Sequence, residues 1–284
     1  LIVTGVQTCA LPILAQLGVW GWTVLVLIPF FFIMLFGTKD TSEIYAKPLG
    51  LIYKPKWENF SSAWNAGPDQ GTIGVWFINT GLLVATALFV SLIVAVPAAY
   101  FTIFLPAKAA RKVMVTVLAG TVVPTILLVI PYFKAYNQFG FLNKPIAAGV
   151  AYGTLAIPTT FLLMNRFFLD FPREILEAGL LDGLSNFRIF RKLVLPLSVG
   201  QIVSVGILTL IWAWGDSQIA IVLLQSQSAQ PISVGMLSFA ADFTTNLGAT
   251  FAGLSMAAIP PVILYIILRS EEHTSESSHD QISY

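Results

Sequence analysis

Long runs of apolar residues constrain this chain more than any other feature of its sequence. A helix needs about 20 residues to cross a hydrocarbon core of ~30 Å, and the sequence contains six apolar runs of that order. Lipid offers no partner to an exposed backbone polar group, so such runs must be helices. The sequence therefore predicts an all-α membrane protein with six transmembrane helices, at about residues 16–36, 76–105, 113–133, 146–168, 199–224 and 250–268.

The composition agrees with several membrane spans. The chain is 56% hydrophobic and 10% charged, with a mean hydropathy of +0.81, values that lie outside the range of a soluble domain. The first apolar run is longer than the core of a signal peptide and lacks a good cleavage site, so we expect it to be retained as an anchor.

The two ends of the chain correspond to opposite strands of one oligonucleotide. Gln7–Ile13 can be encoded by CAG ACG TGT GCT CTT CCG ATC, followed by a T that suits a codon for Leu14. The reverse complement of that DNA encodes Arg269–Ser275. Both ends resemble translated sequencing adapter. We therefore expect residues 1–13 and 269–284 to be non-native segments that flank a transmembrane domain over residues 14–268, and we exclude them from functional reasoning.

That exclusion removes several kinds of chemistry. The only cysteine, Cys9, and both histidines, His273 and His279, lie in the excluded ends. Zinc sites, cysteine or Ser–His nucleophiles and histidine proton relays therefore leave the list of candidates, and no metal site is expected. Residues 14–268 carry fourteen Lys and Arg and ten Asp and Glu, a net charge of 14 − 10 = +4. This weak basic excess fits the cytoplasmic loops of a membrane protein better than a nucleic-acid-binding role.

The orientation follows from the short loops. Residues 106–112 carry three Lys and Arg and residues 170–198 carry four, whereas residues 223–249 carry none. The positive-inside rule places the first two of these loops in the cytoplasm. The longest loop, 37–74, carries four lysines interspersed with acidic residues, and a six-span count places it outside.

The polar segment Glu177–Pro196 interrupts the apolar second half of the chain. Its pattern predicts two short helices joined by a turn. The first begins near Pro172 and ends near Leu181, and Gly183 breaks it because glycine accepts a positive φ. Ser185 is a suitable N-cap for the second helix. The helical period then groups Phe187, Phe190 and Val194 on one face and Arg188, Arg191 and Lys192 on the other.

This segment resembles the EAA loop of permease subunits in binding-protein-dependent ABC importers, and the details resemble their carbohydrate branch, the maltose-type permeases. The residues that match the loop, or occupy its positions, are Glu177, Ala178, Gly179, Asp182, Gly183, Phe190, Leu193, Leu195 and Pro196. Gly179 replaces the second alanine of the family pattern and Leu184 replaces a usual alanine. By this resemblance the loop is the surface that docks on the ATPase.

Two further segments are similar to the same family. Trp57–Trp64 followed by Phe77–Thr80 resembles the outer loop and second span of the maltose-type permeases, and Trp212, Trp214 and Asp216 resemble its Trp-Asn-Asp motif with Gly215 in place of asparagine. A surface loop with locally packed tryptophans explains the first segment equally well. Polar residues that could line a translocation path, or equally serve as helix-packing contacts, are Asn79, Thr80, Gln201, Ser204, Trp214, Asp216 and Gln218.

The resemblance implies a function and a set of partners. It implies one half of the translocation path for a sugar or oligosaccharide across a bacterial or archaeal inner membrane. The implied partners are a second homologous permease, two ATPase subunits, an extracytoplasmic sugar-binding protein and the lipid bilayer. The sequence has no Gly-x-x-x-x-Gly-Lys-Ser/Thr loop, so ATP and Mg²⁺ are expected on the ATPase. No cofactor is expected on this chain, and it is not expected to be an enzyme.

The alternatives are a permease for a non-sugar solute, an ion-coupled secondary transporter and an intramembrane enzyme. Secondary transporters usually carry ionisable groups within their spans, whereas Arg166 and Asp216 lie near span ends. A cytoplasmic position for the Glu177–Pro196 segment distinguishes the ABC permease from the other two classes.

Overall fold

The computed structural model describes residues 4–51, 53–65, 72–242 and 246–280, which form helices and no strand. The all-α prediction is confirmed. The chain divides into two compact units, one made of Leu1–Ala66 with Phe239–Ala258 and the other of Gly67–Ser238 with Ile259–Tyr284. The expected non-native ends include residues 1–3 and 281–284, which lie outside the described residues, and their origin stays a prediction.

The first unit contains α1 (Thr4–Gly37), α2 (Thr41–Ala46), α3 (Glu58–Asn65) and the first turns of α14 (Leu247–Asp280). Two buried polar side chains hold the loop after α1. The Lys39 ammonium donates hydrogen bonds to the carbonyls of Lys47 and Pro48, at 3.1 and 2.8 Å. The Asn59 amide donates to the carbonyls of Gly37 and Lys39, at 3.0 and 2.8 Å. The bonds satisfy the buried polar groups of Lys39 and Asn59 themselves.

An exposed ion pair lies in the same loop. The Lys56 ammonium is 2.8 Å from the carboxylate of Asp40. The hydrogen bond from Lys56 holds the pKa of the Asp40 carboxyl below its ordinary value.

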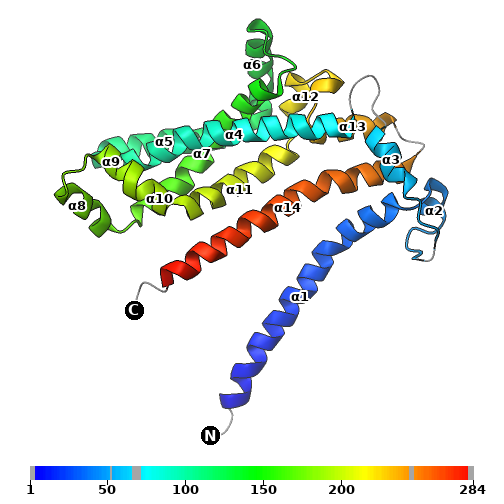
Figure 1. Ribbon diagram of the computed structural model, residues 1–284, viewed down its shortest axis with the longest axis horizontal. Coiled ribbons are helices and arrows are strands. Elements are labelled where there is room, and N and C mark those ends of the chain that lie inside the picture. Colours follow the sequence, from blue (N-terminus) through cyan, green and yellow to red (C-terminus); the bar gives the residue numbers. More distant parts are fainter. Residues whose placement is uncertain (1–3, 52, 66–71, 243–245, 281–284) are drawn as a thin grey trace. The chain divides into compact units, whose positions relative to one another are not determined.

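In the second unit, α4 (Ile73–Thr102) and α7 (Pro145–Leu169) run side by side (Figure 1). Glycines on α7 permit this close packing. A Cβ atom added at Gly149 would lie 2.6 Å from the Leu83 carbonyl oxygen, and one added at Gly153 would lie 2.6 Å from Cβ of Val90. These two glycines form a Gly-x-x-x-Gly pattern, which lets helix backbones approach closely in lipid, where apolar association supplies little driving force.

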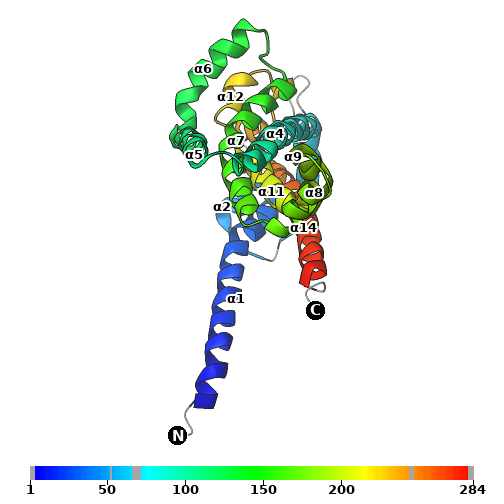
Figure 2. The same ribbon diagram turned by 90° about the vertical axis from the view of Figure 1, so that its left-hand side faces the viewer.

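The predicted third span, 113–133, is wrong as one continuous helix. It is divided between α5 (Ala107–Val122) and α6 (Thr125–Gln138), which meet at 90° (Figure 2). The break falls at Pro124. The residue before a proline is sterically driven out of the helical region, and Val123 is extended, with φ −69° and ψ 116°.

The predicted fifth span, 199–224, is too long. Helix α11 covers Val199–Gly215 and ends before Asp216, where the backbone becomes extended. The short helices α12 (Ala220–Leu223) and η2 (Gln227–Ala229) follow, and then α13 (Ile232–Asp242). In the described part of the chain four helices are long and apolar enough to span a membrane, or up to six if each bent pair counts as one span. The upper number equals the predicted count, but it joins residues 186–197, which were predicted to lie in a cytoplasmic loop, to α11 as one span.

Two apolar cores lie toward opposite ends of α4. One gathers Leu83, Val84 and Ala87 with the start of α7, the end of α11 and α12. The other gathers Val96, Ala99 and Tyr100 with the end of α7 and the segment 189–194. The segment 177–196 therefore lies at the end of α4 remote from the 223–231 loop, as the predicted membrane orientation requires.

Candidate functional site

The segment predicted to be a helical hairpin folds as one. Helix α8 covers Arg173–Leu181, and α9 (Asn186–Ile189) leads into a π-helical turn, η1 (Phe190–Val194), and then α10 (Leu195–Leu197). We call α8–α10 the hairpin. It lies beside the last turns of α4, next to the start of α5 (Figure 1). The predicted end of the first helix at Leu181 is confirmed. Ser185 occupies the N-cap position of α9 as predicted, but its side chain makes no capping hydrogen bond.

Gly183 forms the turn as predicted. Its φ is +74°. The Gly183 amide donates to the Leu180 carbonyl and the Leu184 amide donates to the Gly179 carbonyl, each at 3.0 Å. This pair of bonds is the Schellman arrangement, in which a residue with positive φ closes a helix and satisfies its last carbonyls.

Gly179 lies where the two arms of the hairpin cross. It is buried, and an added Cβ atom would lie 2.9 Å from Cγ1 of Ile189 and 3.1 Å from Cδ1 of Leu193. The glycine thus allows α8 to pack directly on α9 and η1. Glycine replaces the alanine of the family pattern at this position. The replacement allows the close packing but lowers the helix propensity of α8.

The predicted apolar face of the second arm is partly wrong. Phe190 and Val194 are buried, but Phe187 is 60% exposed and Ile189 takes its place. The π-helical turn explains the difference, because each of its turns contains more residues than the α-helical period used for the prediction. Phe190 stacks 4.9 Å from the ring of Tyr100 on α4, measured between ring centroids.

The outward face of the hairpin combines acidic and apolar side chains. Glu177, Ala178 and Asp182 are exposed, and Leu181 beside them is 89% exposed. Leu180 and Phe187 extend the apolar surface. Among the described residues Glu177 makes no hydrogen bond or ion pair, so its carboxylate is free to meet a partner. Leu193 and Leu195 are half-buried, whereas Pro196 is exposed.

Asn79 and Thr80 lie at the opposite end of α4 and bind a loop. The Asn79 amide donates to the carbonyls of Ser228 and Gln230, at 2.8 and 3.0 Å. The Thr80 hydroxyl accepts a hydrogen bond of 2.8 Å from the amide of Ile232. Both side chains are buried, so in this structure their polar groups serve helix–loop packing.

Asp216 and Trp214 lie near that end as well. The Tyr152 hydroxyl donates to the Asp216 carboxylate at 2.7 Å and accepts from the amide of Ala220 at 3.1 Å. The ring of Trp214 is 6.2 Å from that of Phe77. Asp216 thereby fixes the turn that ends α11.

The remaining predicted path residues are dispersed. Gln201 and Ser204 are half-buried near the start of α11, and Gln218 is exposed beyond its end. At 1.5 Å per residue, Gln201 and Trp214 are about 20 Å apart along the helix. The predicted path residues are thus spread along the helix, and their role in a translocation path stays a prediction.

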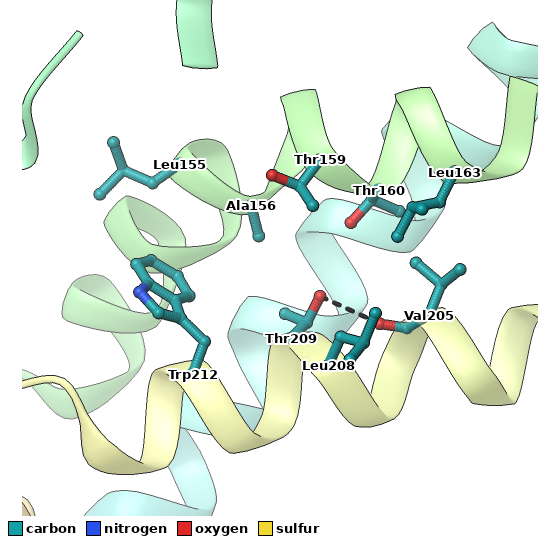
Figure 3. Close-up of a pocket in the computed structure, with 9 residues that line it drawn as sticks. All are labelled: Leu155, Ala156, Thr159, Thr160, Leu163, Val205, Leu208, Thr209 and Trp212. Carbon is teal, nitrogen blue, oxygen red and sulfur yellow. Dashed lines mark hydrogen bonds between the residues drawn. The ribbon is translucent and has the colours of Figure 1, made fainter. Parts of the chain in front are cut away.

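A pocket that the sequence did not predict opens between α7 and α11 (Figure 3). Its volume is about 240 Å³, and none of the predicted path residues lines it. The sequence feature that could have indicated this pocket is the pair Thr159 and Thr160, which directly follows Pro158. In the described part of the chain, no group of three or more His, Cys, Asp or Glu side chains could hold a metal ion.

Comparison with protein families assigns the greater part of the chain to one family. The model for "Binding-protein-dependent transport system inner membrane component" matches residues 87–270.

Among individual proteins, the chain is similar to three permeases. It is 26% identical to the diacetylchitobiose uptake system permease protein NgcG of Streptomyces coelicolor, over 87% of this chain and 82% of that one. It is 26% identical to the melibiose/raffinose/stachyose import permease protein MelC of Bacillus subtilis, over 85% and 86%. It is also 26% identical to the glucose import system permease protein GlcU of Saccharolobus solfataricus, over 87% and 86%.

Among solved structures, the fold is similar to a chain of a bacterial ABC transporter involved in the import of the acidic polysaccharide alginate. The TM-score is 0.71 at 19% sequence identity, and the similarity covers 95% of this chain and 98% of the other. The arrangement of helices is therefore that of an ABC importer permease.

Proposed function

The chain belongs to the family of binding-protein-dependent transport system inner membrane components, and from that premise we propose that it is the permease subunit of an ATP-driven sugar importer. In this proposal the chain forms half of a translocation path, and a second homologous permease forms the other half. Two ATPase subunits and an extracytoplasmic sugar-binding protein complete the assembly.

The exposed face of the hairpin is the observation that carries the proposal. Leu181 is 89% exposed beside the unpaired carboxylate of Glu177, in a segment outside the spans. A partner protein that covers this face explains both features. Exposed apolar patches with a polar rim are typical of protein–protein contacts. We assign this face to a cleft of the ATPase, where Glu177 meets a basic residue.

The coupling is mechanical in this proposal. The hairpin is continuous with α7 on one side and with α11 on the other. Closure of the ATPase around the hairpin then moves both helices, a rigid-body transition between two packings. ATP and Mg²⁺ bind the ATPase, because this sequence has no phosphate-binding loop.

Sugar as the cargo is supported by the relatives. The similar permeases act in diacetylchitobiose uptake, melibiose/raffinose/stachyose import and glucose import, and each comparison covers more than four fifths of both chains.

Reconstitution tests the proposal. The chain is co-expressed with the second permease, ATPase and sugar-binding protein encoded by the neighbouring genes and placed in proteoliposomes. We expect uptake of at least one of labelled glucose, melibiose and diacetylchitobiose that requires internal ATP and the binding protein. Uptake that needs no ATP and collapses with a proton or sodium ionophore would instead identify a secondary transporter.

A further inference from the structure

The pocket between α7 and α11 is built from the facing sides of two helices. Figure 3 shows its lining, with five residues from α7 and four from α11. The indole of Trp212 stands at one end, Leu163 and Val205 stand at the other, and the side chains of Thr159, Thr160 and Thr209 lie between them. The lining residues are Leu155, Ala156, Thr159, Thr160, Leu163, Val205, Leu208, Thr209 and Trp212.

Thr160 carries a buried hydroxyl without a partner. The residue is 1% exposed, and its Oγ1 atom makes no hydrogen bond within the described structure. Several other helical threonines bond a carbonyl of the preceding turn, as Thr86 and Thr102 do at 2.8 and 2.7 Å. The Thr160 hydroxyl instead faces the pocket (Figure 3). A buried hydroxyl of this kind is unfavourable until a ligand supplies a donor or acceptor.

Trp212 is held in a fixed position. Its indole lies 5.3 Å from the ring of Tyr152, centroid to centroid. Tyr152 is itself fully buried and bound to Asp216 and Ala220. The indole therefore offers a preorganised flat apolar surface, which costs little conformational entropy when a ligand binds.

The lining indicates the chemistry of the ligand. No charged side chain lines the pocket, so it offers no ion-pair partner to the carboxylate of an acidic sugar or to a cation. Three hydroxyls and one indole suit a neutral molecule that has hydroxyl groups on its edge and C–H groups on its face. The volume of about 240 Å³ lies below the ~300–1,000 Å³ typical of sites for drug-sized ligands. It therefore suits one ring rather than a whole oligosaccharide.

We propose that this pocket is a subsite for one neutral pyranose ring, which stacks on Trp212 and hydrogen-bonds Thr160, with Thr159 and Thr209 beside it. The inference rests on the proposed sugar-import function and adds to it the position and class of the sugar contact. It assigns the contact to α7 and α11 of this chain.

Thiol protection in the reconstituted importer provides the test. Cys9 is the only cysteine of the chain, so Thr159→Cys in a Cys9→Ser background has a single thiol at the exposed edge of the pocket. The matched control is Thr121→Cys in the same background, an exposed threonine of α5 outside the pocket. The rate of alkylation by N-ethylmaleimide is measured with glucose, melibiose, diacetylchitobiose or, as a non-cyclic polyol, mannitol.

We expect a transported sugar at ten times its dissociation constant to slow alkylation of Thr159→Cys about tenfold, with mannitol and the control position showing no change. Adding Thr160→Val should raise the sugar concentration for half-protection about 5- to 10-fold, the effect of losing one hydrogen bond. Trp212→Leu should do the same, and Trp212→Phe should restore most of the affinity. Thr121→Val, tested for the same protection, should leave it unchanged.

Two outcomes would overturn the subsite. Sugar uptake by the unaltered importer without any protection of Thr159→Cys would refute it while leaving the proposed function intact. Protection that depends on the acyl-chain length of the lipid rather than on sugar would assign the pocket to a lipid chain. Absence of uptake for every sugar in the unaltered importer would refute the proposed function, and the subsite with it.

Discussion

The ring of Phe190 lies 4.9 Å from the ring of Tyr100, centroid to centroid, at an interplanar angle of 32°. Phe190 is the first residue of the π-helical turn and Tyr100 belongs to the last turns of α4. The exposed fractions of the two side chains are 7% and 1%. This contact attaches the hairpin to the bundle, whereas Phe187, three residues earlier in α9, is 60% exposed.

Phe190→Ala should therefore detach the hairpin. Truncating a buried phenylalanine costs about 3–5 kcal/mol, and the loss falls on the contact that holds the second arm. We expect faster trypsin cleavage after Arg188 and Arg191, together with loss of ATPase co-purification. The matched change, Phe187→Ala, should weaken co-purification without faster cleavage, because that ring is exposed. Equal cleavage rates in the two variants would contradict the assignment of the buried face.

Glu177→Ala should abolish ATPase docking without affecting the folding of the chain. Removing one partner of a desolvated charge pair costs about 2–5 kcal/mol, a factor of tens to thousands in affinity. Glu177 is exposed and unpaired in the described structure, so the membrane abundance of the chain should not change while co-purification of the ATPase and sugar uptake are lost. Glu174→Ala, one turn earlier on the same helix, serves as the control and should retain both.

Gly183→Ala should destabilise the turn only because alanine disfavours a positive φ. No atom lies within 4 Å of the position of an added Cβ, yet φ is +74°. A left-handed conformation costs an ordinary residue roughly 1–2 kcal/mol, whereas asparagine tolerates it better. Uptake should therefore fall more in Gly183→Ala than in Gly183→Asn. The reverse order would show that the size of the side chain against the ATPase, rather than φ, decides the effect.

The effects of Gly179→Ala and Ile189→Ala on the stability of the hairpin should be non-additive. The added methyl group of the first variant meets Cγ1 of Ile189 at 2.9 Å, and overpacking of this kind costs about 1–3 kcal/mol. Ile189→Ala alone leaves a cavity. The double variant fills part of that cavity and removes the overlap with Ile189, so its loss of hairpin stability, measured by trypsin cleavage, should be smaller than the sum of the two single losses. Simple additivity would exclude the crossing contact.

The membrane orientation is testable with fusions. A reporter active only in the cytoplasm should be active when fused after Lys112 or at Ser185 and silent at Gln227. The structure places the hairpin and the Gln227 loop at opposite ends of α4, since Phe190 contacts Tyr100 while Gln227 accepts a 2.9 Å hydrogen bond from the Trp76 indole. Activity at Gln227 would invert the bundle and remove the docking face from the cytoplasm.

Sequence reasoning succeeded where one local rule decides the structure. Gly183 marks its turn because few other residues accept its φ, and α4 and α7 are long apolar runs that have no alternative in a bilayer. It failed where two segments must meet. The crossing of Gly179 and Ile189, and the widened turn that buries Ile189 in place of Phe187, depend on tertiary packing that no helical period encodes.

The break before Pro124 illustrates an intermediate case. Proline is tolerated within membrane helices when neighbours satisfy the freed carbonyl, and Pro97 and Pro158 lie inside α4 and α7 without ending them. Only the surroundings distinguish these prolines from Pro124. The pocket at Thr160 was unpredictable for a related reason, because an unpartnered hydroxyl is visible only after every neighbour has been placed.

The two ends of α4 are held by different kinds of contact. At its start, Trp76, Asn79 and Thr80 hold the 227–232 loop by four hydrogen bonds between 2.8 and 3.0 Å. Hydrogen bonds weaken steeply when their angle changes, so this loop must travel with α4 as a single body. At its far end α4 meets the hairpin through ring contacts, which constrain direction far less. A force applied to the hairpin would thus let the rings slide and tilt, while the opposite end behaves as a fixed pivot.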